Sequence, residues 1–60
     1  MKVDYNKIYE YLGSISGKVA TPSQIAYFTN HERLYGATMS KLVRDGYLKP
    51  CAEKGFYRVV

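Results

Sequence analysis

The side chains of this sequence that could take part in chemistry are mainly basic, and they gather in its second half. Residues 33–60 hold six Lys or Arg residues against two acidic ones, and residues 1–32 hold three of each sign. The whole net charge of +4 therefore lies in the second half. Such asymmetry favours a surface for a polyanion, and the alternative is an ordinary solvated surface. The basic residues are Arg33, Lys41, Arg44, Lys49, Lys54 and Arg58.

Other reactive side chains are too few and too scattered for a catalytic or metal site. One histidine, His31, and one cysteine, Cys51, accompany five carboxylates. They form no nucleophile–base pair, no set of metal ligands and no glycine-rich phosphate loop. We therefore expect neither an enzyme nor a cofactor, and no small-molecule effector is evident. His31 is expected to be a surface turn residue, and Cys51 a bystander thiol.

Nothing in the composition indicates a secreted or membrane-spanning chain. No apolar run approaches the roughly 18 residues that a membrane helix needs. The N-terminal residues MKVDYNKIYEYL are charged and amphipathic, unlike a signal peptide. A single cysteine cannot form an internal disulfide and suits a reducing compartment. We expect one cytoplasmic domain spanning residues 1–60, without a membrane partner.

Two helices are predicted in the first half of the chain. Asp4 is a good cap for the first, and Gly13 suits its end. Val19-Ala20 is a candidate for a very short strand. The second helix begins at the stretch TPSQ, where Thr21 is the cap and Gln24 has capping-box spacing. The inward residues are Tyr5, Ile8, Tyr9 and Leu12 in the first helix, and Ile25, Ala26 and Phe28 in the second.

A third helix is predicted after a sharp turn at Thr29 and Asn30. Either residue is a suitable cap, and the helix should then run to about Asp45 and end at Gly46. Gly36 weakens such a helix by about 1 kcal/mol relative to Ala, or permits the close approach of another backbone. The predicted inward face holds Tyr35, Met39, Leu42 and Val43.

The hydrophobic period then changes from that of a helix to that of a strand. YLKP and FYRVV read as two strands, and Ala52 to Gly55 fits a turn that closes with a left-handed glycine. Pro50 cannot donate to a ladder, so its strand should lie at an edge. These elements predict an α+β fold of three helices with a C-terminal β-hairpin.

This order resembles the winged helix-turn-helix family of DNA-binding domains over nearly all sixty residues. The stretch TPSQIAYFTN resembles the first helix of the motif with its turn, and ERLYGATMSKLVRDGYL resembles the recognition helix and its exit. In that family the pattern Leu-x-x-x-Gly, then an aromatic or aliphatic residue, then Leu marks the end of the recognition helix and the start of the wing. Here its residues are Leu42, Gly46, Tyr47 and Leu48.

The resemblance implies a set of DNA-contacting residues. Arg33, Ser40 and Lys41 would meet guanine acceptors or phosphates, Arg44 a phosphate, and Lys54 at the wing tip the adjacent groove or backbone. Lys49 and Arg58 would flank the tip on the strands. Thr21 and Ser23 would hold a phosphate at the start of the second helix, or simply cap that helix. Helical spacing places these residues outward on the third helix: Arg33, Leu34, Ala37, Ser40, Lys41 and Arg44.

The implied function is sequence-specific binding of double-stranded DNA by a small transcriptional regulator. Two alternatives stay open, namely a protein-interaction module on the same scaffold and an RNA-binding winged helix. Tyr11 and Tyr27 lie off the main apolar stripes of their helices, and exposed tyrosines are favoured at interfaces. We therefore expect a homodimer through the first helix.

Overall fold

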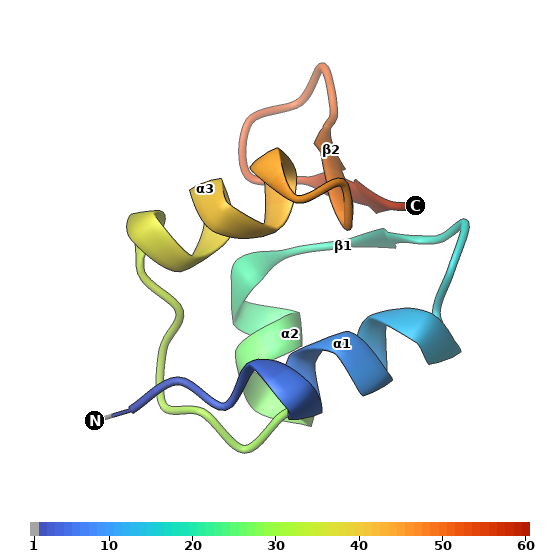
Figure 1. Ribbon diagram of the computed structural model, residues 1–60. Helices are drawn as coiled ribbons and strands as arrows, with labels where there is room; N and C mark the ends of the chain where they lie inside the picture. The colour runs from blue at the N-terminus through green and yellow to red at the C-terminus, as the bar shows by residue number, and fades with distance from the viewer. Residues whose placement is uncertain (1) are drawn as a thin grey trace.

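Three helices and three short strands follow one another along the part of the chain that the computed structural model describes, residues 2–60. The helices are α1 (Tyr5–Ser14), α2 (Pro22–Phe28) and α3 (Gly36–Arg44), and the strands are β1 (Val19–Ala20), β2 (Leu48–Pro50) and β3 (Tyr57–Val59). Figure 1 shows β1 connecting the end of α1 to the start of α2, and the β2–β3 hairpin standing beside α3. The predicted α+β class with a C-terminal hairpin is confirmed.

The first two helices begin where their capping residues predict. The Asp4 carboxylate accepts a hydrogen bond from the Lys7 backbone N–H at 3.2 Å, and the Thr21 hydroxyl accepts one from the Gln24 N–H at 3.1 Å. Each bond satisfies one of the N–H groups that a helix start leaves without an internal acceptor. The reciprocal half of the capping box does not form, because the Gln24 amide donates to the Tyr11 hydroxyl at 3.0 Å.

Thr21→Ala is expected to lower the free energy of unfolding by about 1 kcal/mol, since the Gln24 N–H loses its acceptor. Urea denaturation followed by circular dichroism measures this change. Ser23→Ala is the matched control, because Ser23 lies two residues after the cap in the same turn, is exposed and is not the cap. Equal losses in the two variants would show that the cap does not stabilise α2.

The strands form one antiparallel sheet in the order β1-β3-β2. The predicted short strand at Val19–Ala20 is thus confirmed, and it pairs with the last strand of the chain. Leu48 lies opposite Val59, and both side chains are buried. Pro50 lies in β2 at the edge of the sheet, as its missing N–H predicts. Gly55 closes the hairpin turn with a φ of 89°, which also agrees with the prediction.

The core lies where the helices meet the inner face of the sheet. Leu42, Leu48, Ile8, Leu12 and Ile25 are at most 2% exposed, so the predicted convergence of these side chains is confirmed. The prediction is wrong for Phe28, which is 60% exposed. Its ring instead stacks on Tyr11 at the surface, with the centroids 5.3 Å apart. The core side chains are Ile8, Leu12, Ala20, Ile25, Ala26, Leu34, Met39, Leu42, Leu48 and Val59.

The third helix begins later than predicted, at Gly36. Thr29 does not cap it, because the Thr29 hydroxyl donates back to the Ile25 carbonyl at 2.6 Å and so closes α2. Asn30 has a φ of 60° and makes the sharp turn. Gly36 is therefore the first residue of the helix. No backbone approaches it closely, since an added Cβ would meet nothing within 4 Å.

Candidate nucleic-acid interface

The outward strip of α3 is the part of the predicted site that the helix itself presents. Ala37, Ser40 and Arg44 are exposed along it, together with Gly36 at its start. Thr38, Met39 and Leu42 are buried on the opposite side. The helical period thus places the predicted residues Ala37, Ser40 and Arg44 on one face of the helix. We call these three residues and Gly36 the α3 strip. Three small residues leave the helix backbone accessible, and Arg44 adds a cation.

The segment before α3 corrects two predictions. Leu34 was expected to face outward, but it is only 7% exposed and belongs to the core. Tyr35 was expected in the core, but it is the N-cap of α3 and is 64% exposed. The reason is that residues 33–35 lie outside the helix in an alternating segment. Arg33 is exposed in this segment, with its guanidinium carbon 5.4 Å from the centre of the Tyr35 ring.

Lys41 points toward α1 rather than along the α3 strip. Its ammonium lies 2.8 Å from the Asp45 carboxylate and 5.5 Å from the centre of the Tyr5 ring. The Tyr5 ring lies beside the Tyr9 ring, and the Tyr9 ring stacks on the Tyr47 ring with the centroids 4.4 Å apart. The three rings form a row. Lys41 is thus half-buried beside an aromatic row that packs α1 on the α3–β2 turn. Lys41, which was predicted to contact DNA, is thus engaged by contacts within the protein.

The Lys41–Asp45 pair should give the stability a small pH dependence. The hydrogen bond between the two groups raises the pKa of Lys41 and lowers the pKa of Asp45. Because the pKa of Asp45 is lower in the folded chain, the pair stabilises the fold at pH values above the ordinary pKa of a carboxyl group. This stabilisation is lost as the pH falls through the lowered pKa. The raised pKa of Lys41 preserves the pair until strongly alkaline pH. The effect is small because the pair is at the surface.

Asp45→Asn provides the test of this pH dependence. Thermal unfolding of the variant and of the wild type should give different midpoints at about pH 7 and converging midpoints at about pH 2. A difference that persists unchanged in acid would mean that charge pairing is not its cause.

The basic residues of the hairpin lie in two places, Lys49 and Arg58 on the strands and Lys54 in the turn. Lys49 lies directly opposite Arg58 in the β2–β3 register, and both are exposed. Strand alternation puts them on the face opposite Leu48 and Val59, so they point away from the core side on which α3 packs. Arg58 also donates to the Gly17 carbonyl at 3.3 Å. The structure therefore does not bring Lys49 and Arg58 together with the α3 strip.

Lys54 lies in the hairpin turn and is exposed. Figure 1 shows this turn projecting beyond the body of the domain, away from α1. The predicted residues Thr21 and Ser23 stand at the start of α2, where the Thr21 hydroxyl is occupied as the cap and Ser23 is exposed. The capping alternative is thus confirmed for Thr21.

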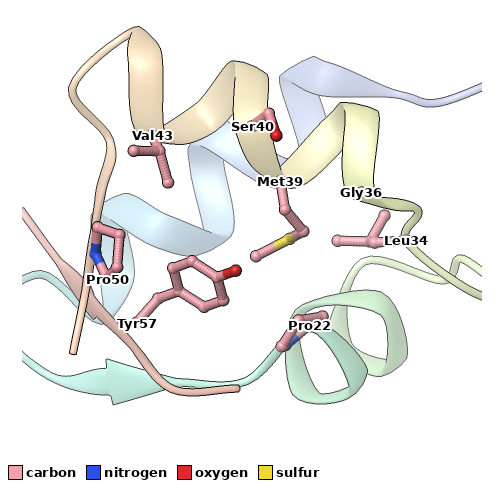
Figure 2. A pocket seen from close by; sticks show the side chains of 8 residues that line it. All are labelled: Pro22, Leu34, Gly36, Met39, Ser40, Val43, Pro50 and Tyr57. Carbon is pink, nitrogen blue, oxygen red and sulfur yellow. The ribbon is translucent and has the colours of Figure 1, made fainter. Parts of the chain in front are cut away.

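A shallow groove lies between α3, the hairpin and the start of α2 (Figure 2). Its volume is about 480 Å³. Figure 2 shows the Tyr57 side chain entering it from β3, with its hydroxyl pointing toward Met39. The groove separates the α3 strip from the hairpin and is mainly apolar. Its lining residues are Pro22, Leu34, Gly36, Met39, Ser40, Val43, Pro50 and Tyr57.

His31 has a structural role that was not predicted. Its Nε2 accepts a hydrogen bond from the Asp4 backbone N–H at 3.0 Å, and its Nδ1 lies 2.7 Å from the Thr29 hydroxyl. These contacts fit the neutral ring with its proton on Nδ1. His31 is half-buried and ties the start of α1 to the turn that leads toward α3.

Residues 2–60 contain no group of three side chains that could hold a metal ion, and no helix among them is long and apolar enough to cross a membrane. Cys51 is a half-buried free thiol. No protein-family model, no curated protein and no solved structure matches the chain. The element order and strand order are compatible with a winged helix-turn-helix.

Proposed function

We propose that this chain is a winged helix-turn-helix domain that binds double-stranded DNA, with α3 in the major groove and the hairpin on its flank. The observation that carries the proposal is the α3 strip. It combines three small residues, Gly36, Ala37 and Ser40, with a basic residue, Arg44, on the outward face of a helix. The major groove of B-form DNA is wide enough to admit one α-helix, and small side chains let the helix backbone approach the base edges.

The chemistry of the strip suits base and phosphate contacts. The Ser40 hydroxyl can donate to or accept from a base edge, and the Arg44 guanidinium can pair with a phosphate or with guanine acceptors. Ion pairing within the protein does not engage Arg44, because the only ion pair among residues 2–60 joins Lys41 and Asp45. The face can therefore offer this cation to a ligand.

Two further cations extend the proposed surface. Arg33 precedes α3 at its N-terminal side, and Lys54 stands at the hairpin turn. Both are exposed, so they can reach DNA phosphates on either side of the major groove that α3 enters. We propose that the protein acts as a small cytoplasmic transcriptional regulator whose binding blocks or recruits other proteins at the occupied site.

Selection of binding sites from random duplex DNA tests the proposal. The expected result is one enriched motif that Ser40→Ala or Arg44→Ala relaxes at individual base positions. Salt-sensitive binding without enrichment would reduce the proposal to binding of the backbone alone. Preference for structured RNA, or no nucleic-acid binding, would replace it by the RNA-binding or protein-interaction alternative.

A further inference from the structure

Three aromatic rings lie together at the surface where α1 meets α2. Tyr27 is 79% exposed and Phe28 is 60% exposed, and their rings meet edge to face with the centroids 5.1 Å apart. Phe28 stacks in turn on Tyr11, with an interplanar angle of 15°. Exposed aromatic rings of this kind are enriched at protein interfaces. We call the surface formed by these three rings the aromatic face.

The aromatic face is anchored to the fold. The Gln24 amide donates to the Tyr11 hydroxyl at 3.0 Å, and this bond joins α2 to α1. A hollow with a volume of about 480 Å³ lies beside them, lined in part by Tyr11, Phe28 and Asn30. A partner that uses this face would therefore meet side chains that the folded chain already positions, at a low cost in conformational entropy.

The charges beside the rings indicate which partner fits. Lys7 and Glu10 line the same hollow, and both are exposed. They lie three residues apart on one side of α1, and neither forms an ion pair within residues 2–60. If two α1 helices pack antiparallel about a two-fold axis between these positions, Lys7 of each copy meets Glu10 of the other. The pattern is self-complementary, which a symmetric dimer interface requires.

The rest of the charge distribution favours the same arrangement. The excess of four positive charges lies in residues 33–60, so contacts between two copies through α3 or the hairpin would oppose like charges. The hollow beside the aromatic face carries one charge of each sign, and two copies can approach there without net repulsion. This arrangement also leaves the α3 strip uncovered.

We propose that two copies of this chain form a symmetric dimer through the aromatic face, with reciprocal Lys7–Glu10 ion pairs at its rim. The inference does not depend on DNA binding, because the interface is separate from the α3 strip. A dimer would present two α3 strips related by a two-fold axis, which is the symmetry of a palindromic DNA site.

Charge reversal tests the reciprocal pairing by sedimentation equilibrium without DNA, from about 10 μM to about 1 mM protein, a range in which a weak dimer dissociates. Lys7→Glu and Glu10→Lys should each weaken the dimer by about tenfold or more, because each places like charges opposite each other. The double variant Lys7→Glu/Glu10→Lys should restore wild-type association. An equimolar mixture of the two single variants should form a heterodimer, in which every rim pair is again attractive.

Two further variants complete the experiment. Phe28→Ser removes the exposed ring and should abolish the dimer, with an unchanged circular dichroism spectrum as the check on folding. Lys18→Glu makes the same change of charge at an exposed position outside the hollow, and should leave association unchanged apart from the effect of net charge. A wild-type protein that stays monomeric throughout would overturn the proposal, as would single reversals that the double variant does not rescue.

Discussion

Leu42→Ala is expected to lower the free energy of unfolding by about 2–5 kcal/mol, the largest stability loss among the variants considered. Leu42 is 0% exposed and joins α3 to the core beside Leu48. Truncating it removes buried apolar area and leaves a cavity that surrounding residues fill only in part. A domain of this size has only marginal stability, so the variant should be largely unfolded at room temperature. Circular dichroism without denaturant, recorded from low temperature upward and compared with the wild type, measures the loss.

Val43→Ala is the matched control for Leu42→Ala. Val43 is the next residue in α3, but it is half-buried on the edge of the groove and not at the centre of the core. Its truncation should cost clearly less, about 1 kcal/mol, because less apolar area is lost. Equal losses in the two variants would contradict the packing of α3 against the sheet.

Arg44→Ala should produce the largest loss of DNA affinity among the alanine variants, with almost no change in stability. Arg44 is exposed at the C-terminal end of the α3 strip and supports no buried contact. If its guanidinium pairs with guanine, its loss should weaken binding to the preferred site by about 1–3 kcal/mol. If it contacts a phosphate, the magnitude of the slope of log K against log salt concentration should fall by about 0.9. Fluorescence anisotropy with a labelled duplex distinguishes the two outcomes.

Two controls with the same loss of charge accompany Arg44→Ala. Lys49→Ala removes a cation from the outer face of the sheet, and Lys41→Ala removes one that is engaged with Asp45. Both should weaken DNA binding less than Arg44→Ala does. If all three losses are equal, only net charge matters and the α3 strip is not the contact surface.

Much of the fold was predictable because local signals agree with tertiary packing. Asp4 and Thr21 cap their helices through short-range hydrogen bonds that depend on residues three positions away. Gly46 leaves α3 with a φ of 88°, a conformation that glycine adopts easily. Leu42 and Leu48, on either side of this turn, are both buried. Such features depend on sequence neighbours, so spacing and residue type are enough to predict them.

The start of α3 was not predictable from the same rules, because two capping signals compete there. Thr29 and Asn30 have the residue types of helix caps, but one closes α2 and the other makes the turn. The two-residue alternation of Arg33, Leu34 and Tyr35 marks an extended segment in which only Leu34 points inward. A helical period therefore predicts the wrong directions for Leu34 and Tyr35.

Side-chain contacts between distant parts of the chain account for the other differences. His31 bonds to Asp4, twenty-seven positions away, and no local pattern marks this pairing. Lys41 has helical spacing that suits either an outward or a flanking direction, and the Tyr5 ring and Asp45 decide between them. Phe28 fits the apolar stripe of α2, but its ring pairs with Tyr11 outside the core. The outward directions of Ala37, Ser40 and Arg44 were thus predictable from the sequence. The directions of Leu34, Tyr35 and Lys41 were not.

The salt dependence of duplex binding by the wild-type protein tests the central claim most directly. Anisotropy titrations of a short duplex at several salt concentrations give log K against log salt concentration. Contacts from Arg44, Lys54 and Arg33 to phosphates predict a straight line with a slope of about −2.7, because each phosphate contact contributes about −0.9. An affinity for duplex DNA that is absent or independent of salt would contradict the proposed function.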